Sequence, residues 1–171
     1  MTGHLGLGSN LGDRRARLQA AVDGLAARGV RATASSSLYE TDPVGDVLDQ
    51  PAFLNACLAI ETDLGPDALL DACKDVERDA GRVTDPGAPD YVRHGPRPLD
   101  VDVLLLDGAT HAGERLTVPH PALLQRRFVL IPLLELDFDL ATPDGVRLAD
   151  ALAALPVTEG VRREGAALDL P

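Results

Sequence analysis

The chain has 171 residues, 45% of them hydrophobic, which is enough apolar material for one domain with a core. Its net charge of -11 argues against a nucleic-acid-binding surface, and no phosphate-binding motif of the G-x-x-x-x-G-K-[ST] type surrounds its single lysine, Lys74. The sequence contains neither a signal-peptide pattern nor an apolar run that could span a bilayer, so we expect a cytoplasmic protein without membrane partners.

The first half of the chain predicts strands that alternate with two helices. Asp13 is placed to cap the first helix, and Pro66 suits the first turn of the second, where its missing N–H costs nothing. In chain order we expect a strand over 3–7, a helix from Asp13 to Gly29, strands over 31–39 and 53–62, and a helix from Pro66 to Gly81.

The second half opens with a long loop over 82–98 that is rich in proline and glycine, and such loops are commonly functional. An apolar strand over 100–106 follows. The apolar run over 128–134 contains Pro132, which indicates either an edge strand or an early break of the strand. The other predicted elements are a short helix over 122–127, a C-terminal helix over 148–155 and a loose polar tail over 159–171.

The order β-α-β-β-α-β over residues 3–106 is the ferredoxin-like arrangement, in which an antiparallel sheet carries both helices on one face. We therefore predict the α+β class and a single domain over residues 1–171, with a C-terminal extension beyond the ferredoxin-like core. Gly6, Gly8 and Gly12 make a tight turn into the first helix. They do not complete a dinucleotide-binding fingerprint, because Leu11 occupies the last glycine position.

Two carboxylates, Asp100 and Asp102, lie at i and i+2 in the predicted strand, so both point to one face. Adjacent acids repel unless a cation lies between them, and hard divalent ions take carboxylate oxygens together with substrate phosphates. Arg93 and Arg97 precede the pair and suit phosphate contacts. The pattern indicates metal-dependent chemistry on a nucleotide phosphate, although an Asp-x-Asp pair can also face water or cap a turn.

Other polar and aromatic residues leave two interpretations open. Phe53 and Phe128 are either core residues or a sandwich for a flat heterocycle whose edge Asn55 reads. His120 is either a turn histidine or a phosphate contact, and Glu77 suits a structural partner for an arginine.

Several ordered motifs remain: G-S-N-L-G at 8–12, Y-E-T-D-P-V-G at 39–45, Q-P-A-F-L-N at 50–55, G-P-R-P-L-D-V-D at 95–102 and V-P-H-P at 118–121, followed by R-R-F-V-L at 126–130. This series resembles the hydroxymethyldihydropterin pyrophosphokinase family of folate biosynthesis, from the N-terminus to about Gly145. The resemblance implies transfer of pyrophosphate from ATP to the hydroxymethyl group of 6-hydroxymethyl-7,8-dihydropterin, with release of AMP.

The resemblance also implies a role for individual residues. Asp100 and Asp102 would hold two Mg²⁺ ions, while Arg82 and Arg97 would be the catalytic arginines that close over the phosphates. The residues that would bind the pterin are Thr41, Asp42, Val44, Phe53, Asn55, His94 and Phe128. Those that would contact ATP are Glu77, Arg93, Arg115, His120 and Arg126.

Three departures from the family pattern fall in the long loop. His94 stands where the family often has Trp, Pro98 replaces a common Thr, and the segment over 83–92 is longer than in compact members. We expect activity with altered closure of this loop, and we hypothesise that His94 still stacks on the substrate.

Two other functions remain open on the sequence alone. A metal-dependent phosphohydrolase would use the same Asp pair with water as nucleophile, and a non-catalytic ferredoxin-like module would bind a ligand without Mg²⁺. We expect small-molecule substrates, no nucleic-acid partner and a monomer.

Overall fold

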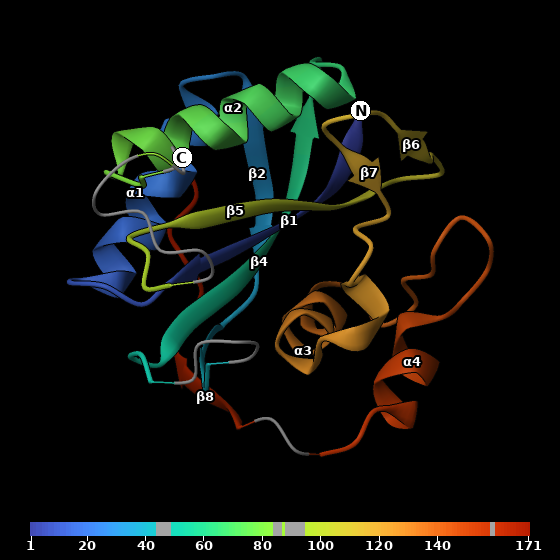
Figure 1. Ribbon diagram of the computed structural model, residues 1–171. Helices are drawn as coiled ribbons and strands as arrows, with labels where there is room; N and C mark the ends of the chain where they lie inside the picture. Colours follow the sequence, from blue (N-terminus) through green and yellow to red (C-terminus); the bar gives the residue numbers. More distant parts are fainter. Residues whose placement is uncertain (44–48, 84–86, 88–94, 158–159) are drawn as a thin grey trace.

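The computed structural model describes residues 1–43, 49–83, 87, 95–157 and 160–171. Figure 1 shows how its strands and helices are arranged. The strands are β1 (Thr2–Ser9), β2 (Val30–Ser35), β3 (Leu38–Thr41), β4 (Phe53–Thr62), β5 (Asp100–Leu106), β6 (His111–Ala112), β7 (Thr117–Val118) and β8 (Val161–Gly165). The helices are α1 (Arg14–Ala26), α2 (Pro66–Asp79), α3 (Arg127–Leu136) and α4 (Leu148–Ala154), with a 3-10 turn over Leu123–Gln125.

The main sheet is antiparallel and has the strand order β5-β1-β4-β3-β8, with β2 also paired to β4. Strand β1 therefore lies between β4 and β5. Its Gly8 is opposite Asn55 on one side and Asp100 on the other. Residues opposite one another in neighbouring strands share a face of the sheet. The side chains of Asn55 and Asp100 therefore project from the same face, on either side of Gly8.

One face of the sheet is covered by α1 and α2 and holds the larger apolar core (Figure 1). Leu5 and Leu58 of the sheet and Leu18 of α1 are completely buried there. Burying such a side chain contributes about 1.5–3 kcal/mol, so this face supplies most of the hydrophobic stabilisation. Asp13 caps α1 as predicted, because its Oδ1 accepts a 3.0 Å hydrogen bond from the N–H of Ala16.

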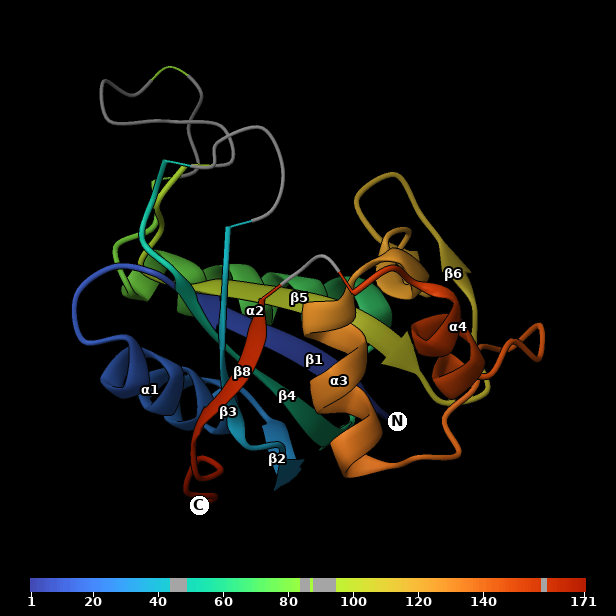
Figure 2. The same ribbon diagram turned by 90° about the horizontal axis from the view of Figure 1, so that it is seen from below.

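The opposite face is covered only in part, by α3, against which α4 packs (Figure 2). Leu130 and Leu133 of α3 are completely buried against Cys57 of β4 and Leu104 of β5. The cover leaves the part of the face around Asp100 and Asp102 open to a cavity, described below.

Three expectations about secondary structure are wrong. The run over 128–134 is not an edge strand but part of α3, because Val129, Leu130 and Leu133 are buried at helical spacing while Pro132 is tolerated inside the helix. The strand expected over 31–39 is divided into β2 and β3. The tail is not loose over 161–165, because β8 pairs with β3 and closes that edge of the sheet (Figure 2).

The chain after β8 packs against α1. The guanidinium of Arg15 donates to the carbonyl oxygen of Ala166 at 3.2 Å, and Leu168 is buried in the larger core. This packing could not be predicted from the tail itself, because the tail is polar and its partners lie far away along the chain.

Within the described residues, none of the helices combines the length and the apolar character needed to cross a membrane.

Candidate active site

A cavity of about 260 Å³ opens on the partly covered face of the sheet. It lies over β1, between β4 and β5, and the start of α3 borders it. Its polar and aromatic lining residues are Thr41, Asp42, Phe53, Asn55, Arg97, Asp100, Asp102, Arg126 and Phe128. Nine residues expected at the site from the sequence are therefore brought together here.

Two glycines of β1 leave room for this cavity. Gly8 lies between Asn55 and Asp100, and Gly6 lies between Cys57 and Asp102 in the next row. A Cβ on Gly8 would stand only 2.9 Å from Oδ1 of Asn55. From the sequence these glycines were expected in a turn, and their role in the cavity was not predicted. One pattern in the sequence could have predicted this role. Gly6 and Gly8 alternate along one strand, as Asp100 and Asp102 do along another, and glycine inside a strand often marks a place where a ligand approaches closely.

Asp100 and Asp102 both line the cavity, which confirms that they share a face. Arg82 forms an ion pair with one oxygen of Asp100, and Nε of Arg97 lies 3.1 Å from the other oxygen. Burial alone would raise the pKa of Asp100, but the charges of Arg82 and Arg97 hold this pKa below its ordinary value. The two arginines are thus placed beside the acids, as the sequence predicts.

Asp102 lies in a different electrostatic environment. Its pKa is raised, first by burial and then by the negative charge of Asp100. A carboxylate pair of this kind fits a divalent cation, which would relieve the repulsion. In the part of the chain that the structure describes, no three His, Cys, Asp or Glu residues gather as a metal site. Mg²⁺ fits because it commonly takes its remaining ligands from water and substrate phosphates.

Glu77 lies beneath β5 and is completely buried. One carboxylate oxygen accepts a 2.8 Å hydrogen bond from the N–H of Val101 and lies 2.8 Å from Nζ of Lys74 and 2.7 Å from Nη1 of Arg82. Burial raises the pKa of Glu77, whereas Lys74 and Arg82 oppose that shift. The expected arginine partner is confirmed. The residue therefore positions Arg82, and a direct contact with ATP stays a prediction.

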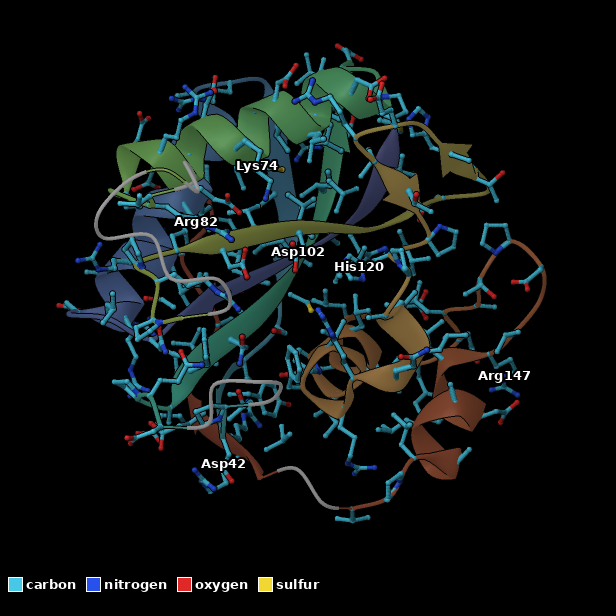
Figure 3. The ribbon with its side chains drawn as sticks, in the orientation of Figure 1. Asp42, Lys74, Arg82, Asp102, His120 and Arg147 are labelled. Atoms are coloured by element: carbon cyan, nitrogen blue, oxygen red, sulfur yellow. The ribbon has the colours of Figure 1, made fainter. Side chains whose placement is uncertain are left out.

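A second cavity, of about 320 Å³, lies beside α2 and β5. It is lined by Lys74, Arg115 and His120, and Asp102 belongs to both cavities. Figure 3 shows Lys74, Arg82, Asp102 and His120 around β5. The only lysine of the chain thus borders the site, a position that its sequence context did not predict.

His120 has a defined orientation in the second cavity. The backbone N–H of His120 donates to the carbonyl oxygen of Leu104 at 2.9 Å. The imidazole Nδ1 accepts a hydrogen bond from the backbone N–H of Ala122 at 3.1 Å. Burial lowers the pKa of His120, with Asp102 opposing and Arg126 reinforcing the shift. A neutral imidazole with Nδ1 as acceptor carries its proton on Nε2, so His120 can donate a hydrogen bond from that atom.

The aromatic part of the first cavity has cationic neighbours. The guanidinium of Arg97 lies 5.3 Å from the ring centre of Phe53, and that of Arg126 lies 5.7 Å from the ring centre of Phe128. Nδ2 of Asn55 donates to Oγ1 of Thr41 at 2.6 Å, and both side chains are buried. This end of the cavity combines two aromatic rings with a fixed amide.

The other predicted residues are placed as follows. Arg115 is exposed and forms a 2.5 Å ion pair with Asp71 of α2. Asp42 lies at the far end of the first cavity from β5, with Arg162 of β8 3.2 Å away (Figure 3). Val44, Arg93 and His94 lie outside the described residues, as does most of the lengthened loop.

Comparison with known proteins identifies the family. Residues 4–138 match the model of the family described as 7,8-dihydro-6-hydroxymethylpterin-pyrophosphokinase. This chain belongs to that family. It is 46% identical over 153 residues to a protein of Methylorubrum extorquens named 2-amino-4-hydroxy-6-hydroxymethyldihydropteridine pyrophosphokinase, covering 89% of this chain and 92% of the relative. A protein of Pseudomonas aeruginosa with the same name is 44% identical, with 94% of each chain covered.

Solved structures support the fold. One titled as HPPK-DHPS in complex with substrates matches with a TM-score of 0.66 over 90% of this chain at 11% identity. A second, the HPPK-DHPS of Plasmodium falciparum, matches with a TM-score of 0.63 over 89% of this chain. This chain spans 43% of each of those solved chains. At these identities the matches establish the mixed α/β fold with its antiparallel sheet.

Proposed function

We propose that this chain is a pyrophosphokinase that transfers the β- and γ-phosphates of ATP as one group to the hydroxymethyl oxygen of 6-hydroxymethyl-7,8-dihydropterin. The oxygen bonds to the β-phosphorus while the bond from that phosphorus to the oxygen retained by AMP breaks. The observation that carries this proposal is the position of Asp102, which borders both an aromatic cavity and a basic cavity. Two different substrates can therefore meet at one carboxylate pair.

Asp100 and Asp102 would hold Mg²⁺, with two ions as the sequence resemblance implies. When bound, such ions neutralise charge on the triphosphate and help to orient the attacking oxygen. The carboxylates present fit this role because both line the first cavity, and Asp102 also borders the second cavity, where phosphates have room. The metal set and the residue roles are proposals that rest on this geometry and on the family.

Arg82 and Arg97 would bind the phosphates. In the structure both contact Asp100, so that carboxylate is already neutralised from two sides. We infer that phosphate oxygens replace Asp100 as the partners of these guanidinium groups once the cation and ATP are present. Arg82 would remain anchored by Glu77, whose buried carboxylate lies 2.7 Å from it. Preorganised cations of this kind stabilise charge that develops on a transferred phosphoryl group.

Phe53 and Phe128 would hold the pterin ring, and Asn55 would bind its polar edge. A flat heterocycle suits two aromatic side chains, and a fixed amide offers both a donor and an acceptor group. Thr41 positions the amide through its 2.6 Å hydrogen bond. Arg126, Arg115 and His120 would bind ATP, with Nε2–H of His120 available to a phosphate oxygen.

We also assign the core to the ferredoxin-like type. The strand order β5-β1-β4 with β2 beside β4, all antiparallel, is the order that two interleaved βαβ units require. A monomeric state, a cytoplasmic location and the lack of nucleic-acid partners stay predictions.

A product assay tests the proposal. Purified protein is incubated with ATP, Mg²⁺ and hydroxymethyldihydropterin, and AMP is separated from ADP, with a control that lacks the pterin. We expect AMP and pyrophosphorylated pterin in equal amounts, and neither product without the pterin. Nucleotide hydrolysis that does not need the pterin would instead support the phosphohydrolase. Binding of ATP without turnover or Mg²⁺ dependence would support the binding module.

A further inference from the structure

Strand β8 lies outside the part of the chain that matches the family model, which ends at residue 138. It pairs with β3, so that Val161 is opposite Thr41 (Figure 2). Just before β8, the carbonyl oxygen of Gly160 accepts a 3.1 Å hydrogen bond from the N–H of Asp42. The C-terminal segment therefore lies directly against the end of β3.

The end of β3 is part of the first cavity. Thr41 and Asp42 both line this cavity, and Thr41 is 2% exposed. The hydroxyl oxygen of Thr41 accepts the 2.6 Å hydrogen bond from Nδ2 of Asn55, the amide assigned above to the polar edge of the pterin. Because β3 lies between β4 and β8, Thr41 is held from both sides, by Phe53 and by Val161. A change in β8 is therefore transmitted to the amide through one buried hydroxyl group.

The side chain of Arg162 joins the two acids at the end of β3. Its Nη2 lies 3.2 Å from Oδ1 of Asp42 and 3.5 Å from Oε1 of Glu40. The other oxygen of Glu40 is 2.8 Å from Nη2 of Arg14, whose Nη1 donates to the carbonyl oxygen of Ala52 at 2.8 Å. The pKa of Glu40 is lowered, first by the hydrogen bond from Arg14 and also by Arg162. These side chains form one charged network that runs from β8 across β3 to the start of β4.

Gly160 allows the close approach of the C-terminal segment to β3. Its φ lies outside the left-handed region, so backbone conformation is not the reason for a glycine here. A Cβ at this position would overlap Oδ2 of Asp42 and would stand 2.8 Å from Cγ of the same residue. By contrast, a Cβ on Gly165, at the other end of β8, would meet Leu38 at an ordinary 3.6 Å. The carboxylate of Asp42 thus explains the glycine at position 160.

We propose that β8 forms the outer wall of the pterin site and that Arg162 is a positioning residue, which holds Asp42 and Thr41 where the polar edge of the pterin binds. The inference rests on the proposed function, because it takes the aromatic cavity as the pterin site. The two aspartates of β5 lie at the other end of that cavity, so β8 should affect the affinity for the pterin and not the affinity for ATP. A purely structural role would instead lower the melting temperature alone, or weaken both substrates together.

The first set of variants changes the charge on β8. Arg162→Met removes the guanidinium but keeps most of the apolar stem. Arg163→Met is the control, because Arg163 is the next residue of the strand and lies 3.8 Å from Glu135 of α3. Arg162→Lys is the rescue variant, since the same nitrogen of Arg162 lies near both acids of β3 and an ammonium group can replace it.

The second set of variants changes the space beside Asp42. Gly160→Ala forces the carboxylate of Asp42 to move, whereas Gly165→Ala adds the same methyl group to the other end of β8 at an ordinary distance from its neighbours. Asp42→Ala and the double variant Asp42→Ala/Gly160→Ala complete a cycle. If Gly160→Ala acts by displacing Asp42, the double variant binds the pterin as well as Asp42→Ala does.

Titration calorimetry measures hydroxymethyldihydropterin binding in the presence of Mg²⁺ and ATP whose α,β-bridging oxygen is a methylene group. A second titration measures binding of this ATP analogue without the pterin, and thermal melting establishes that each variant is folded. Neither titration needs turnover, so the AMP assay on the unmodified chain decides the proposed function separately.

We expect Gly160→Ala to weaken pterin binding about tenfold, because a packed carboxylate must move, and Arg162→Met to weaken it about threefold, because a solvent-exposed ion-pair partner is lost. Arg162→Lys, Arg163→Met and Gly165→Ala should bind the pterin as the unmodified chain does. All variants should bind the ATP analogue within about twofold of the original affinity.

A pterin affinity that either Gly160→Ala or Arg162→Met leaves unchanged would overturn the proposal. So would an equal loss of pterin and ATP-analogue binding, a further loss in the double variant, or an unmodified chain that does not bind the pterin. If Gly160→Ala and Arg162→Met both lose their cooperative melting transition, β8 is required for folding and the positioning role is rejected.

Discussion

The two faces of the main sheet are built from the same strands but use their residues differently. On the face under α1 and α2, Leu5 and Leu58 are completely buried in a continuous apolar core. On the other face, the neighbouring positions carry Gly6, Gly8 and Asp102, and they border a cavity. The period-two alternation of a strand allows one face to provide stability while its neighbour leaves room for substrates.

The difference has an energetic basis. Apolar burial on the first face stabilises the fold, whereas two adjacent carboxylates on the second are destabilising until cations neutralise them. Arg82 and Arg97 neutralise Asp100 in the structure, and Asp102 keeps a raised pKa. We call the face under α1 and α2 the core face and the face with the cavity the site face. Changes on the site face should affect turnover more than stability, and changes on the core face should affect stability more than turnover.

The largest expected effect is on the site face. Asp102→Asn removes the carboxylate that borders both cavities, and we expect turnover to decrease by roughly 10³-fold, as when other preorganised charges are lost. The free energy of unfolding should stay the same or increase, because a repulsive buried charge disappears. Steady-state AMP formation and urea unfolding measure the two effects. Unchanged turnover in saturating Mg²⁺ would remove Asp102 from the metal site.

On the core face, Leu58→Ala should reduce the free energy of unfolding by about 3 kcal/mol, because it leaves a cavity at a completely buried position. At a temperature where the variant remains folded, its kcat/KM should stay within about twofold of the original value. Val157→Ala serves as the control, because Val157 is 84% exposed and should change neither quantity. A large decrease in kcat/KM for the folded Leu58 variant would show that the faces are not independent.

A smaller change tests the space between Asn55 and Asp100. Gly8→Ala introduces a Cβ that would stand 2.9 Å from Oδ1 of Asn55, so the amide must move. We expect the KM for the pterin to increase about tenfold, the cost of one displaced hydrogen bond, with little change in stability. Gly65→Ala is the comparison, because a Cβ there meets nothing within 4 Å. The same KM in the two variants would argue against a pterin at Gly8.

The smallest effect concerns the cover of the site face. Glu135 of α3 accepts hydrogen bonds from the N–H of Ser37 at 3.0 Å and the hydroxyl of Tyr39 at 2.9 Å. Burial would raise the pKa of Glu135, but these bonds and that from the Ser37 hydroxyl lower it, and burial together with Glu135 raises the pKa of Tyr39 to about 12. A lowered folded-state pKa contributes stability above the unfolded value of about 4.3, which is lost as the pH falls through the folded value.

Glu135→Gln should accordingly be less stable by about 1 kcal/mol at pH 7, and the difference from the original chain should shrink below about pH 4.3. Urea unfolding at several pH values measures this difference. A stability difference that grows towards acid pH would contradict the assignment.

The sequence was informative where the physics is local. The i, i+2 spacing placed Asp100 and Asp102 on one face, the length and pattern of β4 were predicted as observed, and Asp13 and Pro66 marked the helix starts. It failed where distant packing decides. The apolar run in α3 has no period that separates a strand from a helix, and only burial against β4 settles it. Strand β8 depends on the unpaired edge of β3, which the tail itself does not reveal.

At the site, too, local patterns were predicted and contacts between distant segments were not. Ordered motifs identified the acids, arginines and aromatic residues, but the roles of Gly6 and Gly8 require the register of three strands. The contacts of Arg162 could not be predicted, because its partners Glu40 and Asp42 are brought to it by folding.

The central claim is that the two substrates meet on the partly covered face, on either side of Asp102. A crystal structure with Mg²⁺, hydroxymethyldihydropterin and the α,β-methylene analogue of ATP would test it most directly. We predict the pterin ring between Phe53 and Phe128, and the triphosphate at Asp100 and Asp102 with its β-phosphorus facing the hydroxymethyl oxygen. A pterin bound elsewhere, or a triphosphate remote from the two aspartates, would contradict the account.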